Sequence, residues 1–302
     1  MAKAFGFVDY GGPETQEFME RPVLEAGPGQ LAIAVRAAGV NPVDWKIRRG
    51  LLGRERTLPA VMGQEASGVV QQVGPGVTGF TPGDEVFGLA AAGAFAEQTL
   101  LRADASALKP GGVGFDRAAV LSVSVATADD AVRDLGLGAG RTVLILGIAG
   151  GVGSAAAQIA RSRGLTVIGT ASDANRQHVE SLGAVQVRYG EGVAERIAAA
   201  APDGVDGVLD LVGGVALREA AGPLKGRVEL VSTADPVTVA ELGGRYVTRS
   251  TTPETLADLA ALVAAGELDP HVTGRYPLDR AVEAVSAVES GHARGKVVLE
   301  IA

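Results

Sequence analysis

The most informative feature of this 302-residue sequence is what it lacks, beginning with cysteine. Without cysteine the chain can form no disulfide, no thiolate metal site and no cysteine nucleophile. Histidine is scarce as well: only His178, His271 and His292 occur, and we expect these separated residues at the surface rather than as ligands. Because zinc needs three or four converging N, S or O ligands, the sequence predicts neither a catalytic nor a structural zinc ion.

Two further absences limit the partners of the chain. Basic residues are not in excess, and the formal net charge of −8 argues against binding to nucleic acid or to an anionic membrane. No apolar run approaches the roughly 20 residues that a membrane-spanning helix needs. The residues Met1–Phe5 lead directly into a strand pattern and do not resemble a signal peptide. We therefore expect a soluble cytoplasmic protein.

What the sequence does contain is a glycine-rich stretch typical of nucleotide binding, within residues 141–170. Thr142–Leu146 has the composition of a buried strand, an alanine-rich helix begins near Gly151, and Leu165–Thr170 is a second buried strand. Two parallel strands need a crossover connection, which the helix supplies. The stretch therefore predicts a βαβ unit.

The glycines between the first strand and the helix have separate predicted functions. Gly147 permits a tight turn, and Gly150 and Gly151 let the backbone approach an anion. Gly153 lets the helix pack closely on the strand. The helix start would then hold a pyrophosphate against its free amides and its positive dipole end. The predicted contacts in this turn are Gly147, Ala149, Gly150, Gly151, Val152 and Gly153; a close-packed turn without a ligand is the alternative.

The rest of the pattern divides the chain into three segments. Residues 1–121 have a β-rich pattern, and residues 122–245 alternate strands and helices, as a doubly wound parallel sheet does. Residues 246–302 hold two amphipathic helices and a final strand. We expect one helix from Asp116, as its N-cap, to about Leu135.

Several stretches, in this order and spacing, resemble the zinc-independent quinone oxidoreductases of the medium-chain dehydrogenase/reductase superfamily. The stretches are 39–46 (GVNPVDWK), 62–70 (MGQEASGVV), 73–77 (VGPGV), 82–86 (PGDEV), 149–153 (AGGVG), 182–184 (LGA) and 292–298 (HARGKVV). The resemblance implies an α/β protein with a GroES-like β-rich substrate domain and a Rossmann-type domain, and an active site between them. It also implies a homodimer formed through the strand near Arg245–Arg249.

The end of the second strand of the βαβ unit bears on the choice between NADPH and NADH. An acidic residue there would hold the ribose 2′-hydroxyl and repel a 2′-phosphate. Ser172 and Arg176 instead suit a phosphate, and the resemblance adds Tyr189. Asp173 opposes this unless it only caps the next helix. We expect NADPH.

Three further cofactor contacts are expected near the same sheet. The resemblance places Thr127 near the nicotinamide, and a helix hydroxyl bonded to its own turn is the alternative. Val212 and Ser232 end the fourth and fifth strands, on the carboxyl edge where ligands bind in open α/β sheets. Ordinary strand ends are the alternative for both.

The chemistry expected of such a site is hydride transfer to an acceptor that the protein positions and polarises. Asn41 could donate to the acceptor carbonyl, Asp44 could orient a neighbour, and Lys46 could stabilise the acceptor oxygen. For Asn41 and Asp44 the alternative is capping of a short helix. Gln64, where zinc-dependent members have histidine, could line the cleft.

We therefore expect NADPH-dependent reduction of a quinone or an α,β-unsaturated carbonyl. An alternative is reduction of an enoyl thioester or a biosynthetic intermediate. A second alternative is a non-catalytic NADPH-binding protein with a structural or regulatory role.

Overall fold

The computed structural model describes residues 1–222, 224, 228–291 and 293–302, and it divides into two compact units. Unit 1 comprises Met1–Ala126 and Thr251–Ala302, and unit 2 comprises Thr127–Ser250. The sequence pattern places these divisions five residues earlier, after residues 121 and 245. At the first division a helical segment continues across the boundary, so the composition gives no sign of it.

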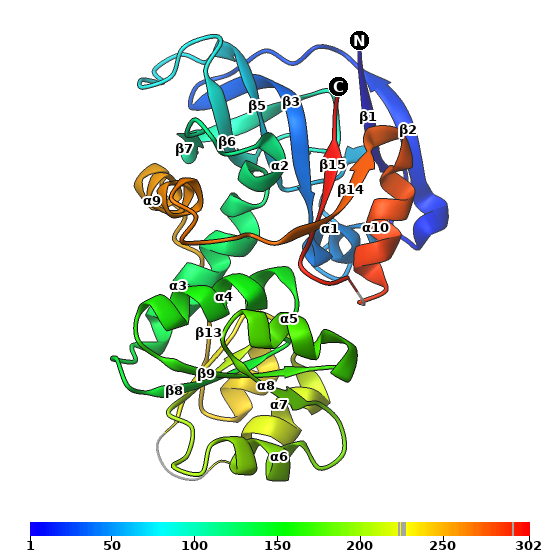
Figure 1. The fold of residues 1–302 in the computed structure, drawn as a ribbon. Coiled ribbons are helices and arrows are strands. Elements are labelled where there is room, and N and C mark those ends of the chain that lie inside the picture. The colour runs from blue at the N-terminus through cyan, green and yellow to red at the C-terminus, as the bar shows by residue number, and fades with distance from the viewer. Residues whose placement is uncertain (223, 225–227, 292) are drawn as a thin grey trace. The chain divides into compact units, whose positions relative to one another are not determined.

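Unit 1 is built mainly of antiparallel strands (Figure 1). One sheet has the order β2–β1–β4, and the other has the order β14–β15–β3–β5–β6–β7. Because β3 pairs with both β5 and β7, the strands β3, β5, β6 and β7 close into a ring. The strands are β1 (Ala2–Phe7), β2 (Gln16–Arg21), β3 (Gln30–Val40), β4 (Ala60–Val61), β5 (Glu65–Val73), β6 (Glu85–Ala90), β7 (Gln98–Leu108), β14 (Val272–Pro277) and β15 (Lys296–Glu300).

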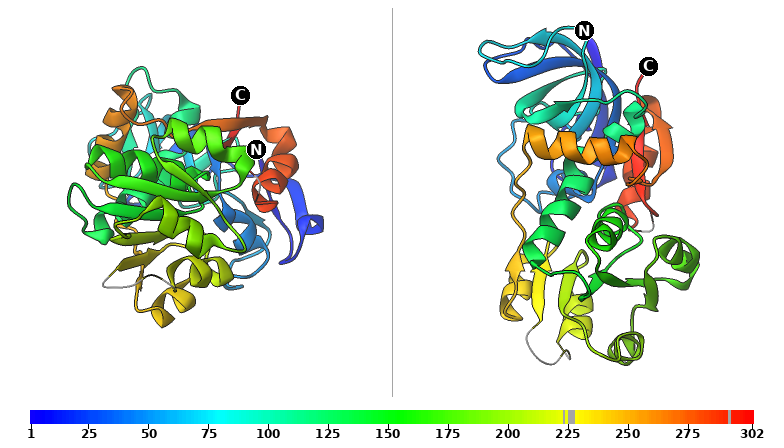
Figure 2. Two further views of the ribbon diagram at one scale, coloured as in Figure 1. Left: turned by 60° about the horizontal axis from the view of Figure 1, so that its bottom comes forward. Right: turned by 60° about the vertical axis from the view of Figure 1, so that its left-hand side comes forward.

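The core of unit 1 lies between these strands and the helices that cover them. Phe5, Ile33 and Phe95 are among its fully buried side chains. Helix α9 packs against β7, which the right-hand view in Figure 2 shows, and α10 packs against β14 and β15. The helical segments are η1 (Pro13–Thr15), α1 (Pro42–Arg48), α2 (Phe115–Ala118), η2 (Leu121–Val125), α9 (Pro253–Ala264), η4 (Leu278–Arg280) and α10 (Ala281–Glu289).

Unit 2 is a parallel sheet with the strand order β10–β9–β8–β11–β12–β13. Its strands are β8 (Thr142–Leu146), β9 (Thr166–Ala171), β10 (Val185–Arg188), β11 (Gly207–Asp210), β12 (Glu229–Ser232) and β13 (Arg245–Tyr246). Its helical segments are α3 (Ala126–Leu135), α4 (Gly151–Ser162), η3 (Asp173–Asn175), α5 (Arg176–Ser181), α6 (Val193–Ala200), α7 (Gly214–Ala221) and α8 (Pro236–Glu241). The predicted doubly wound sheet is confirmed.

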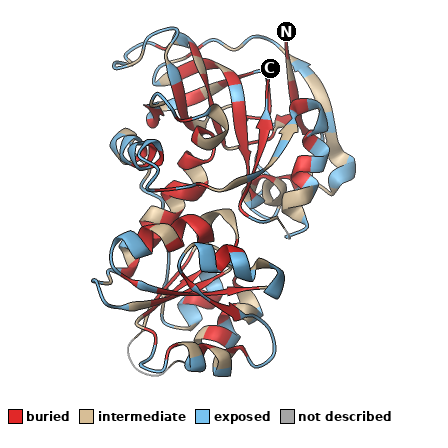
Figure 3. Cartoon of the chain, in the orientation of Figure 1, coloured by how far each residue is buried: buried red, intermediate tan, exposed pale blue. Residues whose placement is uncertain are grey.

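Helices cover both faces of this sheet. Apolar residues of α6, α7 and α8 pack with Leu144, Leu146 and Ile168 on one face, and Figure 1 shows α4 and α5 on the opposite face. The central strands are therefore buried on both sides (Figure 3), which explains why β8 is almost continuously apolar in sequence. Among the described residues, no helix combines the length and apolar character needed to cross a membrane.

The helix predicted from Asp116 to Leu135 is wrong in its start and its continuity. Gly114 is the N-cap of α2, and the helical path is interrupted before η2 and then resumes as α3. The Asp116 carboxylate instead accepts hydrogen bonds from the guanidinium of Arg275, 159 residues later. A distant partner of this kind leaves no trace in the local pattern.

Candidate cofactor and active-site residues

The turn between β8 and α4 has the tight geometry that its glycines predict. Gly147 has a φ of +80°, in the left-handed region, and its amide donates to Thr170 Oγ1 at 3.1 Å. At Gly153, a Cβ would lie 2.5 Å from the carbonyl oxygen of Gly147 and 2.6 Å from Cα of Ile148. The tight turn predicted at Gly147 and the close packing predicted at Gly153 are therefore confirmed, and their contacts with a cofactor stay predictions.

Gly150 occupies a different kind of position, because the protein itself leaves room there. Its backbone is extended, with φ −77° and ψ 173°, and a Cβ would meet only the Gly147 carbonyl oxygen, at 3.6 Å. Gly150 is the N-cap of α4, and no side chain caps this helix. The first amides of α4, from Gly151 onward, have no acceptor within the helix. Open space beside uncapped amides fits an anionic group.

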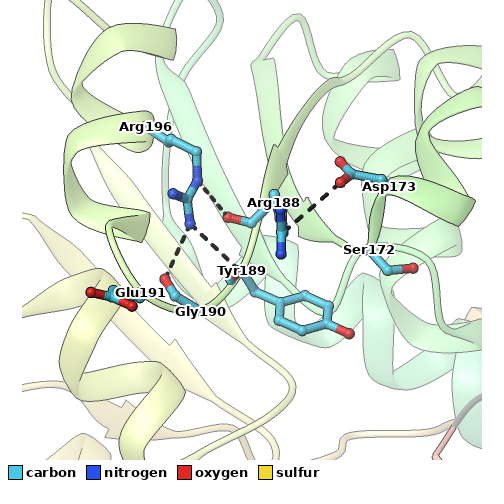
Figure 4. Close-up of a pocket in the computed structure, with 7 residues that line it drawn as sticks. All are labelled: Ser172, Asp173, Arg188, Tyr189, Gly190, Glu191 and Arg196. Atoms are coloured by element: carbon cyan, nitrogen blue, oxygen red, sulfur yellow. Dashed lines mark hydrogen bonds and ion pairs between the residues drawn. The ribbon is translucent and has the colours of Figure 1, made fainter.

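A pocket of about 640 Å³ lies at the carboxyl ends of β9 and β10 (Figure 4). Two residues expected at a cofactor phosphate, Ser172 and Tyr189, line it, and the Tyr189 side chain is exposed. Arg176, the cation expected there, is not part of the lining. The lining residues are Ser172, Asp173, Arg188, Tyr189, Gly190, Glu191 and Arg196.

The cations of this pocket are two arginines that sequence reasoning missed. The Arg196 guanidinium donates to the carbonyl oxygens of Arg188 (2.9 Å), Tyr189 (3.4 Å) and Gly190 (3.1 Å), so it is fastened to the loop it faces. Arg188 is the last residue of β10, and its Nε lies 3.9 Å from an Asp173 oxygen. Arg188 directly precedes Tyr189, and that adjacency was the signal available in the sequence.

Arg176 and Asp173 form an ion pair with each other. Nη2 of Arg176 lies 3.3 Å from Oδ1 of Asp173, and Nη1 lies 3.8 Å from Glu180. All three side chains are about half exposed. Ser172, not Asp173, is the N-cap of the short helix η3 that precedes α5, so the capping role considered for Asp173 is wrong.

In unit 1, a buried polar cluster joins the end of β3 to the starts of α1, β5 and β15. Nζ of Lys296 donates to Oδ1 of Asn41 at 2.5 Å and to the carbonyl oxygen of Val40 at 3.1 Å. Nδ2 of Asn41 donates to Oε1 of Glu65 at 2.9 Å, and that oxygen lies 3.7 Å from the Lys296 ammonium. Asp44 Oδ2 accepts a hydrogen bond from the main-chain amide of Asn41 at 2.8 Å.

Burial dominates the electrostatics of this cluster. Desolvation raises the pKa of Asp44 to about 7, and the hydrogen bond from the Asn41 amide only partly offsets it. Its Oδ1 is buried without a hydrogen-bond partner among the described residues. Desolvation also lowers the pKa of Lys296, although the nearby Glu65 and Asp44 act in the opposite direction. Asn41 is the N-cap of α1 and Asp44 lies in its first turn, which agrees with the alternative roles considered for them, and their catalytic roles stay predictions.

Lys46 and Gln64, in contrast, are only partly buried. Lys46 follows Trp45 in α1, and its Nζ lies 5.9 Å from the centre of the Trp45 ring. Gln64 lies in the short connection between β4 and β5, where its main-chain oxygen accepts the Ala90 amide at 2.9 Å. Of the predicted catalytic residues, these two present side chains that are not committed to the buried cluster.

Comparison with known proteins places this arrangement in a family. Residues 27–128 match the family model described as "Alcohol dehydrogenase GroES-like domain", and residues 182–299 match the one described as "Zinc-binding dehydrogenase". The chain is 34% identical to the NADPH-dependent alkenal/one oxidoreductase of Arabidopsis thaliana, with coverage of 98% of this chain and 79% of that protein. It is 31% identical to the quinone oxidoreductase of Sus scrofa, with coverage of 96% and 95%. The chain belongs to the quinone oxidoreductase family of the medium-chain dehydrogenase/reductase superfamily.

Solved structures of the family have the same fold. The quinone oxidoreductase from Coxiella burnetii matches with a TM-score of 0.90 and 30% identity over 100% of this chain and 99% of that one. The Escherichia coli quinone oxidoreductase complexed with NADPH matches with a TM-score of 0.88 and 27% identity over 99% of both chains. The predicted GroES-like and Rossmann-type architecture is confirmed.

The other cofactor contacts expected in unit 2 differ in accessibility. Thr127 is partly buried in the first turn of α3, and Val212 is 54% exposed just beyond β11. Ser232 is fully buried: its Oγ donates to Asp210 Oδ2 at 2.6 Å and accepts the amides of Ala234 and Asp235. Ser232 therefore organises the ends of β11 and β12 and offers no exposed atom to a ligand.

The structure also gives the positions of two of the three histidines, His178 and His271. His178 is only 8% exposed, and its Nε2 lies 2.9 Å from Oγ of the buried Ser154, so the expected surface position is wrong. His271 is partly buried, and His292 lies outside the described residues. Within the described part of the chain, His, Asp and Glu side chains form no group of three that could hold a metal ion.

Proposed function

We propose that this chain is an NADPH-dependent oxidoreductase that transfers a hydride to a quinone or an α,β-unsaturated carbonyl compound without zinc. The observation that carries the proposal is the presence of two anion-binding features at the ends of neighbouring strands in one parallel sheet. One is the glycine turn after β8, and the other is the arginine-containing pocket after β9 and β10. An NADP molecule has two phosphate centres of this kind, the pyrophosphate and the 2′-phosphate.

The topology supports this assignment of phosphates. Strands β8, β9 and β10 are adjacent, and neighbouring strands lie about 4.8 Å apart. The carboxyl ends of parallel strands meet at one edge of the sheet, which is where nucleotides bind in open α/β sheets. An adenosine ribose can therefore reach from the β8 turn to the pocket beyond β9.

The proposed contacts follow from the accessible groups. The amides of Gly151, Val152 and Gly153 would hold the pyrophosphate, and the absence of a Cβ at Gly150 would allow its close approach. Ser172, Tyr189, Arg188 and Arg196 would bind the 2′-phosphate through hydroxyl and guanidinium donors. Thr127 and Val212 remain proposed contacts nearer the nicotinamide.

Bound NADPH would supply the hydride, and the protein would then have to stabilise the charge that develops on the acceptor oxygen. Lys46 and Gln64 are our candidates for that role, since their side chains are not tied into the buried cluster. The Lys296–Asn41–Glu65–Asp44 cluster would hold the start of α1, and with it Lys46, in a fixed position.

Zinc independence is proposed from the side chains present. The chain has no cysteine, and Gln64 replaces the histidine expected in zinc-dependent members. The comparisons support the choice of cofactor and acceptor, because the relatives named above are described as NADPH-dependent alkenal/one and quinone oxidoreductases, and one was solved with NADPH. We propose a cytoplasmic location as well.

We further propose a homodimer in which β13 pairs with the same strand of a second copy. β13 ends the strand order of the sheet, and both of its residues, Arg245 and Tyr246, are exposed. Sedimentation equilibrium of the wild type and of a Tyr246→Pro variant tests this, because proline cannot donate to an intermolecular ladder. A monomeric wild type would contradict it.

The function is tested by measuring acceptor-dependent loss of NADPH absorbance with purified protein and a panel of quinones, enones and enoyl thioesters. Turnover of quinones or enones is the expected result, without a requirement for added zinc and without inhibition by a chelator. Gly150→Asp, which places a carboxylate beside the proposed pyrophosphate, should abolish NADPH binding. Turnover of enoyl thioesters alone would favour the biosynthetic alternative, and NADPH binding without turnover would favour a regulatory protein.

A further inference from the structure

The pocket beyond β9 and β10 has an unusual charge balance for a site that binds a phosphate. Its lining holds two arginines, Arg188 and Arg196, and two carboxylates, Asp173 and Glu191, so its formal charge is zero. The two carboxylates are not equivalent. In Figure 4 the Glu191 carboxylate points away from the other side chains, whereas Asp173 faces Arg188.

The two arginines are held in different ways. The hydrogen bonds of Arg196 go to main-chain carbonyl oxygens, which are neutral, so its positive charge stays in place beside the loop after β10. Arg188 lies 3.9 Å from Asp173, and both side chains are more than half exposed, at 68% and 57%. Exposed ion pairs of this length are weak and exchangeable. A phosphate can therefore displace Asp173 from Arg188, but Asp173 remains beside it.

The Asp173 carboxylate has two partners in the protein, Arg176 at 3.3 Å and Arg188 at 3.9 Å, and its position gives it a third possible one. Asp173 lies two residues beyond the end of β9, at the carboxyl edge of the sheet and next to Ser172. A carboxylate at the end of this strand accepts hydrogen bonds from ribose hydroxyls, and it repels a 2′-phosphate. The same pocket thus presents groups that favour each of the two coenzymes.

From this juxtaposition, which rests on the proposed function, we propose that Asp173 is the residue that sets coenzyme selectivity and that it makes the site accept NADH as well as NADPH. With NADPH, Arg188 leaves Asp173 for the 2′-phosphate, and Arg196 supplies a second, fixed charge. With NADH, Asp173 accepts the ribose 2′-hydroxyl while Arg188 stays beside it. Removing the Asp173 charge frees Arg188 and removes the ribose acceptor together.

The test is isothermal titration of NADPH and NADH into the wild type, Asp173→Asn, Arg188→Gln and the matched control Glu191→Gln. We expect the wild type to bind both coenzymes. Asp173→Asn should tighten NADPH binding and weaken NADH binding by roughly five-fold each, the size expected for an exposed charge interaction. Arg188→Gln should weaken NADPH binding and leave NADH binding nearly unchanged. Glu191→Gln removes the same charge without the ion pair and should leave the ratio of the two dissociation constants within about two-fold.

A salt series adds a second readout that does not depend on turnover. The effect of Asp173→Asn on NADPH binding should shrink at high ionic strength, since exposed charges are screened. The inference is overturned if the wild type binds NADPH but not NADH, if Asp173→Asn leaves the ratio unchanged, or if Glu191→Gln changes it equally. Failure of the wild type to bind either coenzyme would overturn the proposed function as well.

Discussion

Substitutions at two glycines near the β8–α4 turn, Gly153 and Gly150, test close packing and ligand binding separately. At Gly153 a Cβ would lie 2.5–2.7 Å from three backbone atoms of Gly147 and Ile148, none of which can rotate away. Overpacking of this kind costs about 1–3 kcal/mol. Alanine recovers roughly 0.4–1 kcal/mol by restricting the unfolded chain. We therefore expect Gly153→Ala to lower the stability of unit 2 by about 1–2 kcal/mol, or its unfolding midpoint by roughly 3–8 °C.

Gly150→Ala is the matched control, because its Cβ would make only an ordinary contact of 3.6 Å. Alanine is less favoured than glycine at an N-cap, but it also restricts the unfolded chain, so the two effects offset and stability should change by less than about 0.5 kcal/mol. The new methyl group would enter the space assigned to the pyrophosphate. NADPH affinity should then fall about ten-fold or more, the cost of losing a close charge-assisted contact.

Thermal unfolding followed by circular dichroism and titration of NADPH fluorescence measure the two effects separately. A Gly153→Ala variant as stable as the wild type would refute the packing argument. Normal NADPH affinity in a folded Gly150→Ala variant would refute the assignment of this turn to the pyrophosphate.

Three further predictions concern buried polar groups. Because burial raises the pKa of Asp44 to about 7, the native state binds more protons than the unfolded chain between about pH 4 and about pH 7. The stability of the wild type relative to Asp44→Asn should therefore fall as pH rises from about 4 to about 7, with a slope approaching 1.4 kcal/mol per pH unit between the two pKa values, and level off above about pH 7, measured by chemical unfolding between pH 5 and about pH 8. Lys296→Met leaves the buried Glu65 without its cation and should cost about 3–5 kcal/mol, and Lys296→Met with Glu65→Gln should cost less than the sum of the single changes. Ser154→Ala removes the hydroxyl beside Nε2 of His178 and should cost about 1–3 kcal/mol by the same assay.

Each of these has an outcome that would contradict it. A stability difference between wild type and Asp44→Asn that grows with pH would mean that the Asp44 carboxyl is ionised in the native state at low pH. Additive costs for Lys296→Met and Glu65→Gln would show that the two side chains act independently. An unchanged unfolding midpoint for Ser154→Ala would show that the contact with His178 does not contribute to the stability of unit 2.

The nucleotide-binding sheet could be predicted because its signals are local. Buried parallel strands such as Thr142–Leu146 are continuously apolar, and Gly147 and Gly153 mark the turn between strand and helix. The pattern also predicts both ends of β10, Val185 and Arg188. In each case neighbouring residues along the chain carry the structural information.

The elements and residues that sequence reasoning missed depend on distant partners. Strand β2 has two polar residues on each side of Phe18 and Met19 and so lacks the alternation expected of a strand; it is a strand because it pairs with β1. Lys296 reads as the start of an apolar strand, yet its ammonium is buried against Asn41, 255 residues earlier. Arg196 belongs to the pocket only because its side chain turns back along α6 onto the carbonyls after β10. Spacing along the chain cannot show these contacts.

The order in which unit 1 is assembled has a consequence for synthesis on the ribosome. β15 lies between β14 and β3 in its sheet. The sheet that β3 begins early in synthesis is therefore completed only when β14 and β15, the last two strands of the chain, have been synthesised. Unit 2 is one uninterrupted run, Thr127–Ser250, and can complete its fold during that wait. A nascent chain that stalls before residue 272 would therefore carry a finished nucleotide-binding unit joined to an incomplete β-sheet whose strand β3 lacks a neighbour.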